Sequence, residues 1–361
     1  MIDAAHVYAA IMAGGSGTRF WPRSRQNCPK QYLSILGKDS LILSTVKRFN
    51  PLVPLERIFV ITRRDQEEQI VRHLPSAVLA NVLYEPIGRN TAACIGLAAL
   101  HVMNLDPEGV MIVSPADHLI RKVKRFHHSL ESAVSIAVEQ KGMVTLGIVP
   151  DSPATGYGYI QIGAEIEGGG QNAFAIKTFA EKPNLATAQR FIESGDFFWN
   201  SGLFVFKAST YFKAVKEFLP DLFHGLMDIR KSLNRPEYDG VLQDTYHKFK
   251  DISIDYGIME HARNVFMVRG DFEWSDLGSW EQVYRLSPKD EQENTVFGEA
   301  VMVDTKRSLI DNADGMVAVI GLENVIVVKE KDTVLVCHRD RVEDVKQIVD
   351  RLKRRNLTDF I

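Results

Sequence analysis

Short apolar runs rich in valine and isoleucine alternate with amphipathic stretches along the first part of the chain. The amphipathic stretches have helical periodicity and begin at Asp65, Thr91 and Phe126. This alternation is typical of βαβ units, so the sequence predicts an α/β fold with a Rossmann-like, mostly parallel (mixed) sheet flanked by helices. The apolar runs predict strands at 7–12, 57–62, 78–85, 110–114 and 143–149.

The pattern changes after Pro150. The segments "TGYGYIQIG" and "NAFAIKTFAEKP" predict two antiparallel strands around a glycine-rich connection. We expect them to belong to a lobe, at about residues 150–265, that is inserted over the sheet rather than forming part of it.

The hydrophobic pattern of the sequence changes again from about Asn294. The runs "VMVD", "GMVAVIG", "NVIVVKE" and "TVLVCHR" are short predicted strands divided by Gly, Asn and Asp turns. They predict a small β-helix-like unit at 289–361, following a larger domain at 1–288.

A terminal helix is predicted from Arg341 onwards. Asp340 and Glu343 have the spacing of a capping box, and apolar residues from Val342 to Leu352 form one face. Such a face needs a cover, which either the main domain or a neighbouring subunit would provide.

The composition limits the classes of partner. The 361 residues are 45% hydrophobic and 25% charged, which is ordinary for a globular protein, and 43 basic against 46 acidic residues leave a net charge of -3. This balance predicts no nucleic-acid and no membrane partner. Three widely spaced cysteines fit neither a disulfide framework nor a zinc cluster, and the N-terminus has no signal-peptide pattern. We therefore expect a cytoplasmic protein.

The stretch "IMAGGSGTRFWPRSRQNCPK" at residues 11–30 places glycines and then cationic side chains after an apolar run. It fits neither common phosphate-binding fingerprint. The dinucleotide form would need glycine where Phe20 stands, and the P-loop form would need a Gly-Lys pair. Pro22 and Pro29 also exclude a continuous helix, so we predict a long loop.

That loop has the groups to hold a polyphosphate. Successive backbone amides of the glycine run are predicted to form a nest around an anion. The planar guanidinium group of Arg19 and the ammonium group of Lys30 would add positive charge. A glycine turn with solvated arginines is the structural alternative, and the loop alone does not decide between the two. The nest would consist of Gly14, Gly15, Ser16 and Gly17.

Two aspartates are candidates for a metal site. The segment "VMIVSPADH" delivers Asp117 to the carboxyl edge of a strand, where open α/β sheets bind ligands. Asp276 stands in "FEWSDLGSW". Magnesium takes one or two carboxylates and fills its octahedron with substrate phosphates and water, so this pair predicts Mg2+. A helix cap is the alternative role for Asp117.

At this point the sequence resembles the sugar-1-phosphate nucleotidylyltransferases and, within them, the mannose-1-phosphate guanylyltransferase family. The resemblance runs from Met12 to about Trp280. It rests on "AGGSGTRFWPRSRQNCPKQYL", "EPIGRNTAA", "SPADH", "TGYGYI", "FAEKP", "WNSGLFVF", "SIDYGIME" and "WSDLGSW" in this order. Where the family usually reads "GRNTAPA", Ala93 and Cys94 stand here.

The resemblance implies the fold of the nucleotide-diphospho-sugar transferases and a reaction of GTP with mannose 1-phosphate that gives GDP-mannose and pyrophosphate. It implies catalytic roles for Arg19, Lys30, Asp117 and Asp276, the two aspartates binding Mg2+. The nucleotide would be bound by Gly14, Gly15, Ser16, Gly17, Thr18, Arg19, Glu85, Gly88, Asn90 and Thr91. The sugar phosphate would be bound by Gly156, Glu181, Lys182 and Asn200.

Alternatives to this interpretation remain in the sequence. One is a related nucleotidylyltransferase with another sugar or base specificity. Another is a non-catalytic, sugar-nucleotide-sensing homologue, which we would expect to lack a metal aspartate, Arg19 or Lys30. A nicotinamide-dependent dehydrogenase is disfavoured by the failed dinucleotide fingerprint. We also expect a homodimer formed through the C-terminal unit. The 75 residues after Leu286 (361 minus 286) are too few for a fused isomerase domain.

Overall fold

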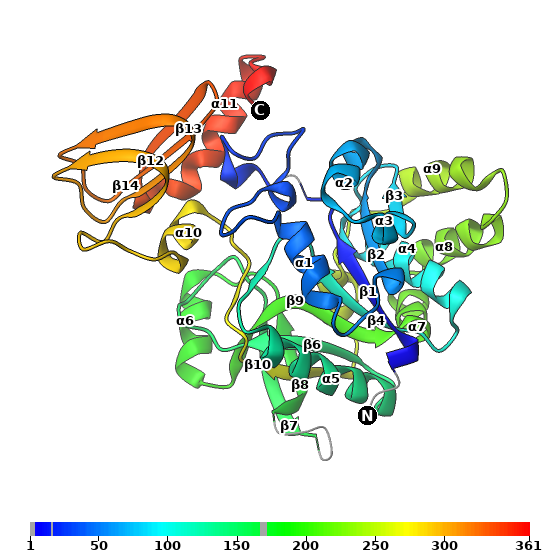
Figure 1. Cartoon of the computed structure of the whole chain (residues 1–361). Coiled ribbons are helices and arrows are strands. Elements are labelled where there is room, and N and C mark those ends of the chain that lie inside the picture. The colour runs from blue at the N-terminus through cyan, green and yellow to red at the C-terminus, as the bar shows by residue number, and fades with distance from the viewer. Residues whose placement is uncertain (1–3, 16, 167–171) are drawn as a thin grey trace. The chain divides into compact units, whose positions relative to one another are not determined.

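The computed structural model describes residues 4–15, 17–166 and 172–361 (Figure 1). The chain divides into two compact units. Unit 1 contains the chain up to Gly14, Thr45–Ala116 and Ile120–Trp274, and unit 2 contains Gly15–Ser44, Asp117–Leu119 and Ser275–Ile361. The expected division of the chain into domains at 1–288 and 289–361 remains a prediction.

Among the described residues, unit 1 is built on one mixed sheet with the strand order β3-β2-β1-β4-β9-β6-β10-β8-β7. Strands β1 to β4 pair in parallel, as do β6 and β10, whereas β9 runs antiparallel to both β4 and β6. The strands are β1 (Val7–Met12), β2 (Ile58–Arg63), β3 (Val82–Glu85), β4 (Val110–Pro115), β6 (Met143–Ile148), β7 (Tyr159–Glu165), β8 (Ala173–Ala180), β9 (Phe197–Lys207) and β10 (Val265–Gly270).

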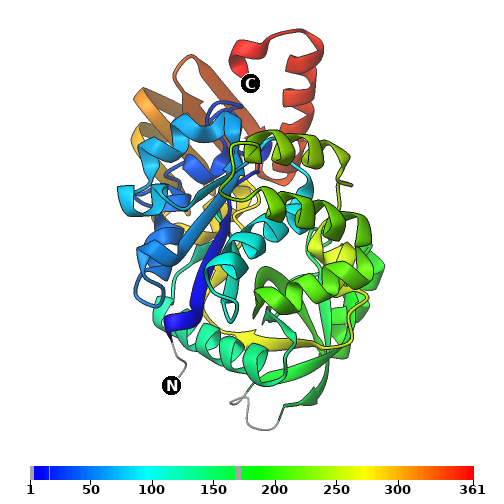
Figure 2. The same ribbon diagram turned by 90° about the vertical axis from the view of Figure 1, so that its right-hand side faces the viewer.

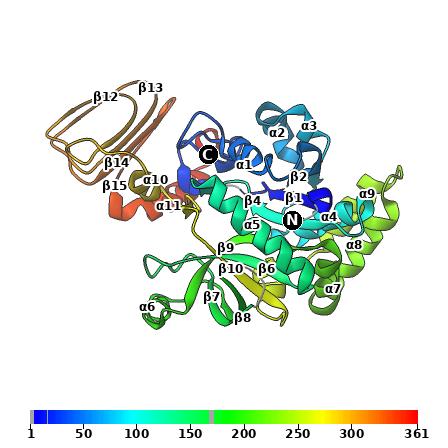
Figure 3. The same cartoon turned by 60° about the horizontal axis from the view of Figure 1, so that its bottom comes forward.

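Helices cover both faces of this sheet, which is why its central strands are apolar at nearly every position. Tyr8 and Ala10 of β1 share a core cluster with α4, and the alternate residues Ala9 and Ile11 are equally buried. Helix α4 lies against β1 to β4 and is itself covered by α7 and α8 (Figure 2), while α5 lies along β4, β6, β9 and β10 (Figure 3). The α-helices are α1 (Leu41–Phe49), α2 (Glu67–His73), α3 (Ser76–Leu79), α4 (Asn90–Leu105), α5 (Val123–Glu139), α6 (Leu185–Ser194), α7 (Ala208–Phe218), α8 (Pro220–Ser232) and α9 (Tyr238–Lys248). They are accompanied by the 3₁₀ helices η1 (Ala4–His6), η4 (Leu55–Arg57) and η5 (Arg64–Gln66) and by the π-helix η6 (Asp255–Met259).

The predicted α/β fold and the five N-terminal strands are confirmed, with one strand shorter than expected because residues 76–79 form α3. The prediction of a lobe separate from the sheet is wrong. Strands β7 and β8 do pair antiparallel, but β8 also pairs with β10 and β7 with β9. The reason is the length of β9: its eleven residues reach past β4 and pair with β7 through Phe197–Trp199.

Unit 2 contains the glycine loop and a C-terminal four-stranded sheet. Strands β12 (Thr295–Val303), β13 (Leu309–Ile320) and β14 (Val325–Glu330) are parallel, and β15 (Thr333–His338) returns antiparallel to β14. The remaining elements are η2 (Thr18–Phe20), η3 (Lys30–Tyr32), α10 (Trp280–Leu286), η7 (Arg339–Asp344), α11 (Val345–Arg354) and η8 (Thr358–Phe360). The strands β5 (Leu119–Ile120) and β11 (Trp274–Ser275) lie where the chain passes between the units.

The apolar face of the terminal helix is covered by its own unit. Val345 and Val349 share a core cluster with Phe20, Trp21 and Trp280. Because these aromatic residues follow the loop glycines or begin α10, the cluster joins the glycine loop to the C-terminal elements. No described helix is both long enough and apolar enough to span a membrane.

The predicted capping box of this helix is wrong. Residues Arg339–Asp344 form the 3₁₀ helix η7, and α11 begins only at Val345. His338 caps η7, because its Nδ1 accepts a hydrogen bond of 3.3 Å from the backbone N–H of Asp340. The N-cap residue of α11 is Asp344, which makes no side-chain capping hydrogen bond.

Candidate functional site

The glycine loop is held closely against Lys30. Gly17 has a φ of 57°, and a Cβ atom added to it would lie 2.4 Å from Cβ and 2.8 Å from the backbone N of Lys30. Gly15 has open space at the same position. Among the described loop glycines only Gly17 has a positive φ, while Ser16 lies outside the described residues. Only glycine satisfies both demands at position 17.

Lys30 is a buried cation of unit 2, with 6% of its surface exposed. Its Nζ donates to Oδ2 of Asp117 at 2.7 Å and to the backbone carbonyl oxygen of Asp276 at 2.6 Å. Nζ also lies 5.6 Å from the centre of the Phe20 ring. The structure therefore brings three of the four predicted catalytic residues together around one ammonium group.

The electrostatics keep Asp117 ionised. Burial alone would raise the pKa of its carboxyl group, but the charges of Lys30 and His118 and the hydrogen bond from Lys30 outweigh burial and lower the pKa below its ordinary value. At neutral pH this group is a carboxylate, so it offers oxygen atoms to a cation.

The turn that carries Asp276 is fixed from both sides. Leu277 is fully buried and has a φ of 46°, an uncommon conformation for a leucine. Its backbone N–H donates to Oγ of Ser275 at 3.0 Å, and the N–H of Gly278 donates to the side chain of Gln282. This over-determined turn holds a sparsely populated backbone conformation beside a candidate ligand.

The donor chemistry of these two aspartates fits a hard divalent cation. Across residues 4–15, 17–166 and 172–361 there is no cluster of three or more His, Cys, Asp or Glu side chains that would hold a metal by itself. Two carboxylates without further protein donors suit a cation that also uses substrate phosphates and water.

The other loop cations have different environments. Arg19 is exposed, and its Nε lies 3.6 Å from Oε2 of the exposed Glu343, an arrangement that contributes at most about 1 kcal/mol. Arg23 and Arg25, in contrast, bind to the C-terminal elements. Of these three arginines, Arg19 is therefore the one placed to exchange its partner for an anion.

In unit 1, Glu85 ends β3 as a buried carboxyl group. Only 3% of the residue is exposed, and its Oε1 has no hydrogen-bond partner among the described residues. Burial raises its pKa to about 8, against the opposing effects of Tyr246, Cys94 and Arg63. A buried acceptor without a partner costs free energy, which a ligand with N–H donors would recover.

The segment after Glu85 leads directly into α4. Asn90 has a φ of 62°, and its Oδ1 accepts from the backbone N–H of Thr91 at 2.9 Å. The Thr91 hydroxyl accepts from the backbone N–H of Ile254 at 2.9 Å. Gly88 lies beside the Arg63 side chain, since a Cβ added to Gly88 would be 3.8 Å from Cδ of Arg63. These contacts fix the start of α4 next to Glu85.

The predicted sugar-phosphate residues are also in unit 1, and most of them form a second cluster. Glu181 has 8% of its side chain exposed and forms an ion pair with the more exposed Lys182. Asn200 donates from Nδ2 to Oδ1 of Asp255 at 2.9 Å, and its Oδ1 accepts from Thr145 Oγ1 at 2.9 Å. The amide of Asn200 is therefore held in one orientation.

Gly156 and Gly158 differ in their surroundings. A Cβ added to Gly156 would have no atom within 4 Å, whereas a Cβ on Gly158 would lie 2.4 Å from Oε2 of Glu181. The backbone carbonyl of Gly158 also accepts from the N–H of Asn200 at 2.8 Å. Gly158, which sequence reasoning did not single out, therefore makes room for the Glu181 carboxylate.

Asp255 is the other residue that sequence reasoning missed. Burial and then the neighbouring Glu181 raise its pKa to about 6. It begins the π-helix η6, a rare element that is frequent at functional sites. The signal available in the sequence was the string "SIDYGIME", which includes Asp255.

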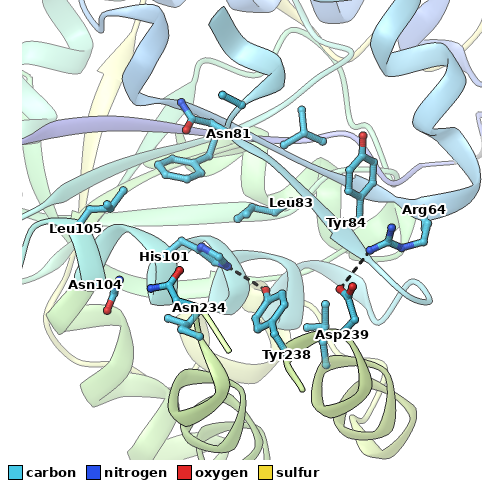
Figure 4. A pocket seen from close by; sticks show the side chains of 15 residues that line it. Arg64, Asn81, Leu83, Tyr84, His101, Asn104, Leu105, Asn234, Tyr238 and Asp239 are labelled. Atoms are coloured by element: carbon cyan, nitrogen blue, oxygen red, sulfur yellow. Dashed lines mark hydrogen bonds and ion pairs between the residues drawn. The ribbon is translucent and has the colours of Figure 1, made fainter. Parts of the chain in front are cut away.

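A cavity of about 400 Å³ lies elsewhere in unit 1 (Figure 4). It is bordered by β3, the end of α4 and the start of α9, and contains a hydrogen bond of 3.1 Å between His101 and Tyr238. None of the predicted site residues lines it.

Comparisons with known proteins identify the family of the chain. The family model "Nucleotidyl transferase" matches residues 8–293, and a "MannoseP isomerase/GMP-like beta-helix domain" model matches residues 298–352. The chain belongs to the nucleotidyl transferase family. The resemblance to mannose-1-phosphate guanylyltransferases is confirmed as well: the chain is 35% identical to such a protein from Klebsiella pneumoniae, over 97% of this chain and 74% of the relative.

Two further relatives support this assignment. The mannose-1-phosphate guanylyltransferase of Salmonella muenchen is 38% identical over 96% of this chain and 73% of its own length. A crystal structure from Thermus thermophilus, described as a mannose-1-phosphate geranyltransferase, has a TM-score of 0.88 and 33% identity, covering 96% of this chain and 99% of that one.

We predict that Gly17→Ala lowers the free energy of unfolding by about 2–4 kcal/mol, because the new methyl group meets the backbone of Lys30 and the residue must keep a positive φ. Gly15→Ala adds the same group in open space and is the matched control, with an expected change within about 0.5 kcal/mol. Urea unfolding measures both. Equal stability of the two variants would contradict the close contact at Gly17.

Proposed function

We propose that the protein transfers GMP from GTP to α-D-mannose 1-phosphate, giving GDP-mannose and pyrophosphate. The observation that carries this proposal is the Lys30 cluster with Asp117 and Asp276, in a chain 35% identical to a mannose-1-phosphate guanylyltransferase. A non-catalytic homologue would be expected to lose one of these groups or Arg19, and all are present.

The sugar phosphate supplies the nucleophile. Its second pKa is about 6, so it is mostly dianionic at neutral pH and requires no protein base. One of its oxygen atoms forms a bond to the α-phosphorus of GTP, the bond from this phosphorus to the α,β-bridging oxygen breaks, and the electron pair leaves with pyrophosphate. The protein's task is to align two anions and to offset their repulsion.

The charged residues of unit 2 suit that task. We assign Arg19 to the departing pyrophosphate and Lys30 to the reacting phosphoryl group, where its ammonium balances developing negative charge. Asp117 and Asp276 would hold Mg2+, which supplies charge neutralisation on the phosphates when bound. In the absence of substrate, Lys30 keeps the Asp117 carboxylate in place through their hydrogen bond of 2.7 Å.

Recognition falls to residues of unit 1. The Glu85 carboxylate would accept from the ring N–H and the amino group of guanine, while backbone amides at 88–91 would donate to its carbonyl oxygen. Glu181 would accept from sugar hydroxyl groups, with Lys182 near the sugar's phosphate. Asn200 and Gly156 complete the proposed sugar-phosphate site. The homodimer and the cytoplasmic location expected from the sequence remain predictions.

The decisive experiment is a substrate panel. We expect purified protein with Mg2+ to release pyrophosphate from GTP only when mannose 1-phosphate is added, because the sugar phosphate supplies the nucleophile. We expect GTP to be preferred among the nucleotides, because Glu85 fits the donors of guanine. Release is measured for GTP, ATP, UTP and dTTP, each with mannose 1-phosphate or glucose 1-phosphate. Equal turnover with UTP and glucose 1-phosphate would contradict the assignment as a guanylyltransferase. Asp276→Asn serves as an inactive control that should remain folded, because Lys30 contacts the backbone carbonyl of Asp276 and not its carboxylate. Asp117→Asn should also be inactive, but it removes the charge partner of the buried Lys30 and should lower the stability as well.

We predict that binding of the guanine base releases a proton. Free Glu85 is largely protonated below its pKa of about 8, whereas a carboxylate is needed to accept two N–H groups. GTP affinity should therefore rise about tenfold per pH unit from pH 6 towards 8 and then level off. Calorimetry in buffers of different ionisation enthalpy measures the proton.

The matched variant for this measurement is Glu85→Gln. Its side chain cannot ionise, so the proton exchange measured with this variant comes from the GTP phosphates and can be subtracted. The variant should bind GTP about 10- to 100-fold more weakly, because one or two charge-assisted hydrogen bonds are lost. Identical proton release by both proteins would exclude Glu85 as the reader of guanine.

We predict a selective effect of Gly158→Ala. The added methyl group meets the far end of the Glu181 side chain, so the carboxylate moves and the fold does not. The KM for mannose 1-phosphate should rise about tenfold, the loss of about one hydrogen bond, while the KM for GTP and the Tm stay within error. Gly240→Ala, which has open space on α9, is the control. An unchanged KM for the sugar phosphate would remove Glu181 from the proposed site.

A further inference from the structure

The described part of the glycine loop has little regular structure of its own. Between Gly17 and Pro29 this structure is the three-residue helix η2, followed by a bridge between Arg25 and Cys28. A loop of this kind loses its conformational entropy either on folding or when a ligand binds.

Arg23 ties this loop to the C-terminal sheet. Its Nε donates to Oδ2 of Asp311 at 2.9 Å and its Nη2 to Oδ1 at 2.6 Å, which makes a two-pronged ion pair. Asp311 lies on the central strand β13, and only 5% of its side chain is exposed. Glu330 of β14 adds a second carboxylate, 3.5 Å from Nη1 of Arg23.

Two neighbouring loop residues have ties of the same kind. Trp21 donates from Nε1 to the backbone oxygen of Phe360 at 2.6 Å. Arg25 donates to the backbone oxygen of Asp359 at 3.0 Å and to the hydroxyl group of Thr333 at 3.1 Å. Within the short segment from Trp21 to Arg25, the loop is therefore attached to the C-terminal part of unit 2 through Trp21, Arg23 and Arg25.

We infer that the contact between Arg23 and Asp311 is a positioning device: the C-terminal sheet holds the glycine loop and Arg19 in the conformation that receives the triphosphate of GTP. This inference rests on the proposed function. Arg23 and Asp311 are positioning residues. The guanidinium group of Arg23 is engaged by Asp311, so Arg23 affects nucleotide binding only through the conformation of the loop. Without this contact, ordering the loop costs conformational entropy when the nucleotide binds, and this cost reduces the binding free energy of GTP. The affinity for the sugar phosphate does not change.

Unit 2 offers a matched control for the test. Glu281 of α10 accepts from Nε of Arg339 at 2.8 Å and from Nη2 at 2.7 Å, so it makes the same two-pronged pair with a partner outside the loop. Both Asp311→Asn and Glu281→Gln change a carboxylate to an amide opposite an arginine. If the pairs only stabilise the fold, both variants should behave alike.

The experiment compares these two variants of the full chain with the unchanged protein. We expect both to lower the Tm by a few degrees. Only Asp311→Asn should speed backbone amide hydrogen exchange in residues 15–28 and raise the KM for GTP about tenfold, with kcat and the KM for mannose 1-phosphate within about twofold. Unchanged loop exchange and GTP KM in folded Asp311→Asn would overturn the inference, as would equal effects of Glu281→Gln.

Arg23→Lys provides a second, milder variant if Asp311→Asn does not fold. It keeps the charge but loses the fork, so we expect the same selectivity at about threefold; no change in loop exchange would again overturn the inference. Hydrogen exchange needs no turnover. Failure of the proposed function, seen as an unchanged protein without activity, is therefore distinguishable from failure of the loop tie.

Discussion

The buried ammonium group of Lys30 is the constraint on which the organisation of unit 2 depends. A buried charge is tolerated only when it is paired and hydrogen-bonded. Here the carboxylate of Asp117 and the carbonyl of Asp276 meet that demand. The three groups come from chain segments separated by long stretches of unit 1, and all of them belong to unit 2. Gly17 completes the arrangement, because its missing side chain lets the loop lie against the backbone of Lys30.

The same division separates two kinds of chemistry. The predicted catalytic residues Arg19, Lys30, Asp117 and Asp276 all lie in unit 2, together with the C-terminal sheet. The residues proposed to read the base and the sugar, among them Glu85 and Glu181, lie in unit 1. Phosphate chemistry needs charged groups in fixed positions. The four predicted catalytic residues belong to the same unit as the C-terminal strands that hold the glycine loop. Recognition of the base and the sugar needs hydrogen-bond acceptors in fixed positions, and the two candidate carboxylates stand at the carboxyl ends of β3 and β8.

The sequence predicted those parts of the fold that local pattern determines. Strands such as β1 are buried on both faces, so their continuous apolar runs identify them. The position of β9 depends on long-range pairing with three strands, and nothing in its own residues specifies those partners. The capping-box prediction failed for a local reason instead: Arg339–Asp344 form the 3₁₀ helix η7, which His338 caps, and α11 begins only at Val345.

The candidate site shows the same limit. The short motifs predicted site roles for Lys30, Asp117 and Glu181 from residue type and order, and these roles remain predictions. They could not show that Arg23 and Arg25 are used by the distant C-terminal elements: Arg23 and Asp311 are 288 positions apart, Arg25 and Asp359 334. Nor could they show that Asp255 lies beside Asn200, a contact made between a π-helix and a distant strand.

Asp117 and Glu85 show why burial alone does not decide what a carboxyl group does. Burial acts on both, yet the pKa of Asp117 is lowered and that of Glu85 is raised to about 8. The difference is the partner: Lys30 supplies a full positive charge to Asp117, whereas Glu85 has chiefly the neutral donors Tyr246 and Cys94. Asp117 is thus a permanent anion suited to a cation. Glu85 becomes one only when a ligand brings N–H donors, so the free-energy cost of its ionisation is met, and recovered, only with a base that donates to it.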